Sequence, residues 1–423
     1  MKITTRERFA QYKVLACLAS LLGLFVLKFI VSEFWQAPFS FYLLALLPLT
    51  AVVLLFLIKI GYMSVKYRSL KKAMIATIIY TQLDTAFSTQ KLLTLSTDDD
   101  EIALTPAIKV GFDDELLLIY VANTIKYQNQ LLDLDLSANV HGFIQYGTAQ
   151  LTADKKWVIY KMADVSADNR LYIKSKSDLP KTMQIDKINK LPLTHYLIAG
   201  KNGSGKSYTI EYLLLNYLNS YKGAKLSIID PKRSDLYQLP FSHADLDNAD
   251  VLLNDFYQKM QKRKDKFEKE ISKKGKLNLD WQDLHWSPIL LVIDEFASFK
   301  AYYDTDTESR KIYKKMQSQL TQLVLQGRQL GVFIWIITQK PMADTLPTAI
   351  RSNLVARLLM GESDPTEQEV VFERRIDAPQ QRLTGQGYLY IARSGSAIVP
   401  VDCPTFECDV LTLFNEFRPR KQV

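Results

Sequence analysis

The sequence predicts an α/β protein with a central parallel sheet, preceded by a two-helix transmembrane hairpin and a small α/β adaptor domain. Short apolar runs alternate with amphipathic helical segments over the second half of the chain, as expected for a parallel sheet covered by helices. One of these runs leads into a glycine-rich loop at residues 200–207. Two apolar stretches of bilayer length lie near the start, at residues 14–31 and 41–58.

The composition argues against a disulfide-rich protein and against a structural zinc site. The chain has 423 residues, of which 48% are hydrophobic and 23% are charged, with 53 basic and 45 acidic side chains. The formal net charge of +8 permits a polyanionic partner without requiring one. Cys17, Cys403 and Cys408 are too few and too scattered for a disulfide framework, and with four histidines a structural zinc site is not expected. A reducing compartment is therefore predicted.

Residues 1–72 are predicted to form the transmembrane hairpin. Lys28 is the only charge within the first span, and the loop SEFWQAPFS between the spans has no Lys or Arg. Basic residues lie before the first span and after the second, so the positive-inside rule predicts a two-span protein of the cell membrane with both termini cytoplasmic. A cleaved signal peptide is the alternative for the first run, but no small-residue cleavage site follows it.

Residues 73–190 are predicted to form the small α/β adaptor domain. The segments 115–125 and 155–163 carry the β-branched and aromatic residues typical of strands, and the polar stretches 98–101 and 166–169 are typical of turns. These residues indicate no specific chemistry, so a spacer or an oligomerisation module is the expected role. The remaining residues, 191–423, are predicted to form one further domain, which contains the glycine-rich loop.

A phosphate-binding loop is predicted after the apolar run HYLIA. The loop GKNGSGKS, residues 200–207, matches G-x-x-x-x-G-K-S and precedes the amphipathic segment YTIEYLLLNYL. Glycines let backbone N–H groups approach phosphates, and the helix N-terminus adds partial positive charge. The residues expected to contact ATP are Gly200, Lys201, Asn202, Gly203, Ser204, Gly205, Lys206, Ser207 and Tyr208.

The catalytic groups are predicted from the same loop and from two further strands. Lys206 is expected to reach the β- and γ-phosphates, and the Ser207 hydroxyl to bind Mg²⁺. The strand in SPILLVIDEF ends at Asp294, a second Mg²⁺ ligand, and Glu295, which would polarise the attacking water. The strand in VFIWIITQK is expected to lie beside it and to bring Gln339 to the γ-phosphate or the water.

These motifs resemble the FtsK/SpoIIIE-type DNA translocases, and the resemblance covers about residues 190–403. Asp230-Pro231-Lys232 after the strand KLSIID is a more specific signal than the phosphate-binding loop, which many nucleotide hydrolases share. The matching elements, in family order, are HYLIAGKNGSGKS, IIDPKRSDL, ILLVIDEF, GRQLGVFIWIITQKP, IRSNL and LTGQGYLYI.

The resemblance implies a RecA-like P-loop ATPase that assembles into a hexameric ring, threads DNA through its pore and binds ATP between subunits. It makes Arg328 the candidate arginine that acts in trans on a neighbour's γ-phosphate, with Arg357 as the second candidate. Whether the DNA is single or double stranded stays open.

A short, two-span translocase resembles the coupling proteins of Gram-positive conjugative plasmids and integrative elements. Such proteins bring DNA and its relaxase to the channel proteins of conjugation, and we expect that function here. The chain ends soon after Cys403, so the C-terminal winged-helix module of chromosomal translocases is not expected. The alternatives are a chromosome or plasmid segregation translocase, and an ATP-binding membrane scaffold that recruits a relaxosome. Lys206, Asp294 and Glu295 argue against the scaffold.

The run QKMQKRKDKFEKEISKKGK, residues 258–276, is rich in both basic and acidic residues. It is interpreted either as a DNA-contacting helix that neutralises phosphates or as a solvated helix held by i,i+4 ion pairs.

Overall fold

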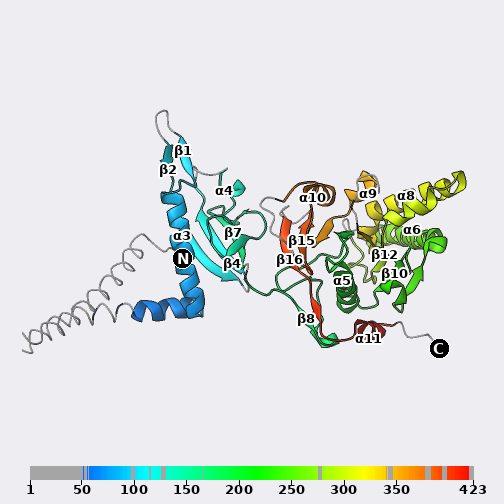
Figure 1. The fold of residues 1–423 in the computed structure, drawn as a ribbon, viewed down its shortest axis with the longest axis horizontal. Helices are drawn as coiled ribbons and strands as arrows, with labels where there is room; N and C mark the ends of the chain where they lie inside the picture. Colours follow the sequence, from blue (N-terminus) through cyan, green and yellow to red (C-terminus); the bar gives the residue numbers. More distant parts are fainter. Residues whose placement is uncertain are drawn as a thin grey trace, which may run out of the picture. The chain divides into compact units, whose positions relative to one another are not determined.

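The computed structural model divides into two compact units, Met1–Ala167 and Asp168–Val423, each of which is described by itself (Figure 1). It describes residues 51, 55, 57–96, 101–113, 116–124, 130–164, 166–274, 279–339, 341, 346–376, 383–392 and 398–418.

The predicted transmembrane hairpin cannot be compared with the structure. The span at 14–31 and almost all of the span at 41–58 lie outside the described residues. Among the residues that are described, no helix is both long enough and apolar enough to cross a bilayer.

The first unit contains an antiparallel sheet with helix α3 (Leu70–Ser88) packed against it. Both strands predicted here are confirmed, as β4 (Leu116–Ala122) and β7 (Trp157–Asp164), which pair with each other. The sheet order is β3-β4-β7-β5, and β6 also pairs with β7. The other elements are β1 (Thr94–Ser96), β2 (Glu101–Ala103), β3 (Ile108–Asp113), α4 (Gln130–Asp133), β5 (Phe143–Gln145) and β6 (Gln150–Leu151).

The division between the units falls at Ala167, within the predicted turn at 166–169, rather than after Lys190. Strand β8 (Tyr172–Ile173) pairs with β17 (Thr405–Phe406) near the end of the chain. Asn189 donates its side-chain amide to the Pro400 carbonyl at 3.1 Å. Residues 168–190 therefore pack with the second unit, because their partners come from its C-terminal strands.

The second unit is built on an eight-stranded sheet with the order β11-β10-β12-β13-β9-β14-β15-β16. Its first six strands are parallel, as predicted, but β15 pairs antiparallel with both β14 and β16. The predicted central parallel sheet is therefore confirmed over these six strands, but the sheet as a whole is mixed because it continues into an antiparallel edge. The strands are β9 (Tyr196–Gly200), β10 (Lys225–Ile229), β11 (Ser242–Ala244), β12 (Ile289–Ile293), β13 (Val332–Thr338), β14 (Ala356–Met360), β15 (Gln386–Ile391) and β16 (Ile398–Asp402).

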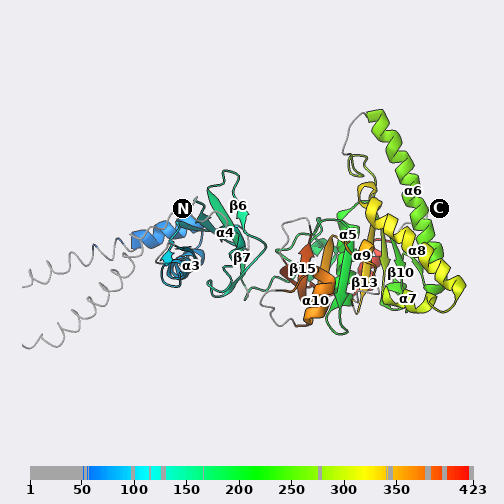
Figure 2. The same ribbon diagram turned by 90° about the horizontal axis from the view of Figure 1, so that it is seen from above.

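The helices cover both faces of this sheet, so its central strands are buried along their whole length. Helices α6 (Ala249–Lys274) and α8 (Thr307–Gln326) lie side by side, and α6 extends beyond the sheet (Figure 2). On the other face, Tyr217 of α5 (Lys206–Ser220) packs edge-on against Trp335 of β13. The remaining helices are α7 (Ala297–Tyr303), α9 (Thr348–Arg351), α10 (Pro365–Phe372) and α11 (Val410–Asn415).

Candidate functional site: a phosphate-binding loop beside two carboxylates

The strand order brings the predicted site residues to one edge of the sheet. Strands β9, β10, β12 and β13 are parallel neighbours, so their carboxyl ends meet at the same edge. The phosphate-binding loop follows β9, and Asp294-Glu295 follows β12. Strand β13 lies between these two, which confirms that Thr338 and Gln339 come from a strand beside the one that carries Asp294.

The phosphate-binding loop leaves its backbone open at the start of a helix. Gly203 and Gly205 adopt positive φ values of 78° and 89°, and helix α5 begins at Lys206. Lys206 is buried, whereas residues 201–203 are exposed. Within the described residues, the buried Ser204 hydroxyl finds no hydrogen-bond partner. A buried cation, an unused hydroxyl and an open glycine backbone at a helix N-terminus fit phosphate groups.

Other segments hold this loop in place. The ammonium of Lys201 lies 3.1 Å from the Glu367 carboxylate at the start of α10, and this hydrogen bond raises the pKa of Lys201. Thr384 donates its hydroxyl to the Gly203 carbonyl at 3.0 Å, and Gly385 donates its N–H to Ser204 at 2.9 Å. The segment LTGQG matches the family pattern, but the sequence does not predict that it contacts the phosphate-binding loop.

We expect Gly205→Ala to damage the loop more than Gly203→Ala. Both positions have positive φ, so a Cβ at either costs about 1–2 kcal/mol. At Gly205 the added Cβ would also lie 2.7 Å from the Gly385 nitrogen, whereas at Gly203 nothing lies within 4 Å. The clash should add about 1–3 kcal/mol. Thermal unfolding and titration with an ATP analogue measure both effects, and equal losses for the two variants would contradict this packing.

Asp294 is suited to a cation. Burial raises the pKa of its carboxyl, the nearby Asp230 and Glu295 raise it further, and the positive charge of Lys206 opposes the rise. A partly buried carboxylate with acidic neighbours favours a divalent cation, and Mg²⁺ in such sites usually takes one or two protein oxygens plus phosphate oxygens and waters. Ser207, exposed at the start of α5, would supply the second oxygen. Together, Ser207 and Asp294 fit the predicted Mg²⁺ ligands.

Tyr208, the last residue predicted to contact ATP, is 58% exposed beside the loop. Its ring centroid lies 6.4 Å from that of Phe406 in β17. The C-terminal strands therefore place a second aromatic ring near the phosphate-binding loop.

Glu295 is held in a strained conformation. Its φ of 47° is left-handed, which for a residue with a Cβ costs on the order of 1 kcal/mol. The side chain is buried, and its carboxylate accepts hydrogen bonds from the Gln339 N–H at 3.2 Å and the Thr338 hydroxyl at 3.3 Å. The predicted residues Glu295 and Gln339 are thus brought together, although the contact with Glu295 is made by the Gln339 backbone.

Lys232 also contacts Glu295, and the sequence did not predict this. The Lys232 ammonium lies 3.8 Å from the Glu295 carboxylate. Asp230-Pro231-Lys232 matches the family pattern, but the pattern alone assigns Lys232 no contact with the catalytic residues. Only the pairing of β10 with β12 shows that Lys232 and Glu295 follow adjacent strands.

The two candidate arginines lie in different surroundings. Arg328 is exposed just before β13, at the edge of the sheet opposite the phosphate-binding loop. Arg357, in contrast, is 2% exposed, pairs with Glu373 at 3.0 Å and donates to the backbone carbonyls of Arg351, Leu354 and Val371. Arg357 is therefore a structural residue of β14, and its candidacy as the arginine that acts in trans is not supported.

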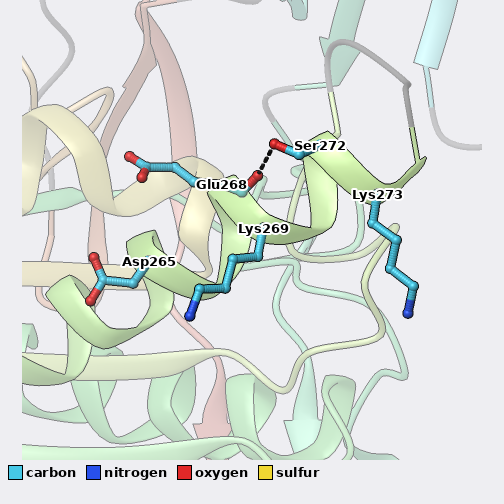
Figure 3. Close-up of a pocket in the computed structure, with 5 residues that line it drawn as sticks. All are labelled: Asp265, Glu268, Lys269, Ser272 and Lys273. Carbon is cyan, nitrogen blue, oxygen red and sulfur yellow. Dashed lines mark hydrogen bonds between the residues drawn. The ribbon is translucent and has the colours of Figure 1, made fainter.

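The charged run at 258–276 lies mostly on α6. A shallow pocket near the outer end of this helix is lined by Asp265, Glu268, Lys269, Ser272 and Lys273, all of them exposed (Figure 3). Ser272 donates to the Glu268 carbonyl, and earlier in the helix Lys259 pairs with Asp255 at 2.6 Å. These mixed charges and local contacts are those of a solvated helix.

Comparisons with known proteins find relatives among DNA translocases, although no protein-family model matches the chain. DNA translocase FtsK of Oceanobacillus iheyensis is 25% identical over 232 residues, which cover 50% of this chain and 28% of that protein. The chain is similar to the FtsK-type DNA translocases. FtsK domain-containing protein YdcQ of Bacillus subtilis is 26% identical over 322 residues, covering 73% of this chain and 64% of that protein. The chain thus spans less than two thirds of the length of either relative.

A solved structure confirms the fold predicted from the FtsK resemblance. The monomer form of the pCW3 conjugation coupling protein TcpA with ATPγS aligns with a TM-score of 0.51 and 18% identity. The alignment covers 80% of this chain and 99% of that one. The second unit therefore has the P-loop ATPase fold of that coupling protein, with a mixed rather than a wholly parallel sheet, and these likenesses support the predicted ATPase.

Proposed function

We propose that this chain is a membrane-anchored, ATP-driven DNA translocase that acts as a coupling protein in conjugative transfer. One observation carries the proposal: a phosphate-binding loop, the Asp294-Glu295 pair and the Thr338-Gln339 strand end meet at one edge of a sheet. The FtsK and YdcQ relatives and the TcpA fold support the DNA and conjugation parts of the proposal.

Each of the site residues has a separate role in the proposed ATP hydrolysis. The loop backbone and Lys206 bind the phosphates, and Ser207 and Asp294 would hold Mg²⁺. When bound there, Mg²⁺ would supply positive charge beside the phosphates. Glu295 orients the attacking water and accepts its proton. Thr338 and the Gln339 N–H hold the Glu295 carboxylate at the end of β12, on the side that faces β13.

The membrane anchor is proposed from the two apolar runs at 14–31 and 41–58. They place the motor on the cytoplasmic side, where it would receive DNA with its relaxase and pass the DNA to channel proteins. The full-length protein should remain with the membrane fraction after a high-salt wash, whereas protein that begins at Lys72 should not. Release of the full-length protein by salt would contradict the anchor.

DNA-dependent hydrolysis tests the activity. The purified protein should hydrolyse ATP faster when single-stranded or duplex DNA is added, and no stimulation by either would contradict a motor. In a mating assay, Glu295→Gln should abolish DNA transfer while the protein stays at the membrane. Undiminished transfer would favour an ATP-binding scaffold, whereas a defect in chromosome or plasmid partition with normal transfer would favour segregation.

The exposed position of Arg328 supports a ring in which ATP binds between subunits. Strand β13 has seven residues and is about 20 Å long, so Arg328 at its amino end lies far from the loop of its own chain. In a head-to-tail ring, which we propose is a hexamer, the same arginine would face the γ-phosphate of the neighbouring subunit.

We expect Arg328→Ala to lower kcat for ATP by about 10²–10³-fold while ATP affinity changes less than about threefold. The matched control is Arg310→Ala, which removes an exposed arginine from α8. A mixture of Arg328→Ala and Lys206→Ala subunits should recover activity, because some interfaces then join an intact Lys206 to an intact Arg328. Normal turnover by Arg328→Ala, or no recovery in the mixture, would contradict action in trans.

A further inference from the structure

The Glu295 carboxylate is contacted from two opposite directions. Thr338 and Gln339 come from β13, which lies on the side of β12 nearer the phosphate-binding loop. Lys232 follows β10, which lies on the other side of β12. The ammonium of Lys232 therefore attracts the carboxylate from the β10 side, opposite to the strand that leads to the phosphate-binding loop.

The loop that carries Lys232 is built to hold this position. The Asp230 carboxylate accepts the N–H groups of Lys232 at 3.1 Å and of Ser234 at 2.6 Å, and also the Ser234 hydroxyl. Arg233 adopts a φ of 50° and pairs with Asp245. These contacts fix the turn, and the left-handed Arg233 sets the direction of the chain directly after Lys232.

We infer that Lys232 is a positioning residue that restrains Glu295 and thereby keeps hydrolysis slow in the resting state. The inference rests on the proposed role of Glu295 as the general base. At 3.8 Å the pair is an electrostatic contact and not a hydrogen bond, so Lys232 acts by biasing where the carboxylate points, and a general base must be oriented toward the attacking water to accept its proton. Neither the Thr338 nor the Gln339 contact carries a charge, so the ion pair with Lys232 is the contact that an anion can compete for.

The surroundings of Lys232 indicate how the restraint is released. Its side chain is 51% exposed, whereas that of Glu295 is 9% exposed, so an anion in solution can reach the ammonium but not the carboxylate. Arg233 next to it is also exposed. The proposed function supplies such an anion, because a DNA phosphate close to this loop would draw Lys232 away and free Glu295.

Steady-state kinetics of the full-length protein tests this inference. Lys232→Ala should raise the DNA-free kcat for ATP about fivefold, as expected for loss of a half-exposed ion pair. The KM for ATP should stay within about twofold, and the DNA-stimulated kcat should stay near that of the wild type. The ratio of stimulated to DNA-free turnover should therefore fall.

Two variants serve as controls. Lys232→Arg keeps the cation and should keep the wild-type ratio, whereas Lys225→Ala removes an exposed lysine at the other end of β10 and should change neither rate. A DNA-free kcat that is unchanged or lowered in Lys232→Ala would overturn the inference. If DNA does not stimulate the wild type, the proposed function fails, but the rise in DNA-free kcat still tests the restraint on Glu295.

Discussion

Glu295→Gln is expected to lower ATP turnover by about 10²–10⁴-fold, because it removes the group that accepts the proton of the attacking water. The amide keeps the size of the side chain and an oxygen that can accept from the Gln339 N–H. ATP affinity should therefore change little, and the variant should trap ATP without hydrolysing it. Single-turnover hydrolysis and nucleotide titration separate these two effects.

The matched control for this variant is Glu373→Gln. Glu373 is also a non-glycine residue with positive φ, at 61°, and it also contacts a basic side chain, but it lies after α10 and is half exposed. It should change turnover less than about threefold. Comparable losses in both variants would show that the effect of Glu295→Gln comes from the backbone and not from the general base.

Lys206→Ala should produce a loss of a different kind, a fall in ATP affinity of about 10²-fold or more. Lys206 is the buried cation of the phosphate-binding loop, and without it the phosphates would face Asp294 with less compensating charge. Addition of ATP should raise the unfolding temperature of the wild type but not that of this variant. Thermal denaturation with increasing nucleotide measures the difference.

Lys222→Ala, which removes an exposed lysine after α5, is the control for Lys206→Ala. It should respond to ATP as the wild type does. If ATP stabilises Lys206→Ala as strongly as the wild type, nucleotide binds elsewhere, and the assignment of the phosphate-binding loop is wrong.

The central strands were predictable because their residues are continuously apolar. HYLIA, ILLVI and VFIWIIT each form one strand that is buried along its whole length. The titratable residue in HYLIA also fits this environment, since burial lowers the pKa of His195 to about 3 and its neutral ring accepts the Ile334 N–H. Asp294, Glu295 and Gln339 were predictable as site residues because they are the polar residues that directly follow two of these strands.

Strand direction and pairing across long separations were not predictable in the same way. An apolar strand has the same pattern whether it runs parallel or antiparallel, so the antiparallel β15 and β16 at the edge of the sheet were missed. The pairing of β8 with β17 joins segments more than two hundred residues apart, and it moves 168–190 into the second unit. The Lys232–Glu295 contact was not predictable for the same reason, because it requires β10 to pair with β12 and the chain to turn at Arg233.

Displacement of streptavidin from biotinylated DNA tests the central claim most directly, because it requires movement along the strand and not only hydrolysis. We predict that the wild-type protein with ATP displaces streptavidin from single-stranded or duplex DNA, and that Glu295→Gln displaces it from neither. The substrate that is cleared also identifies the strand type that the motor follows. If DNA stimulates ATP hydrolysis but streptavidin is displaced from neither substrate, the claim that the protein moves along DNA is contradicted.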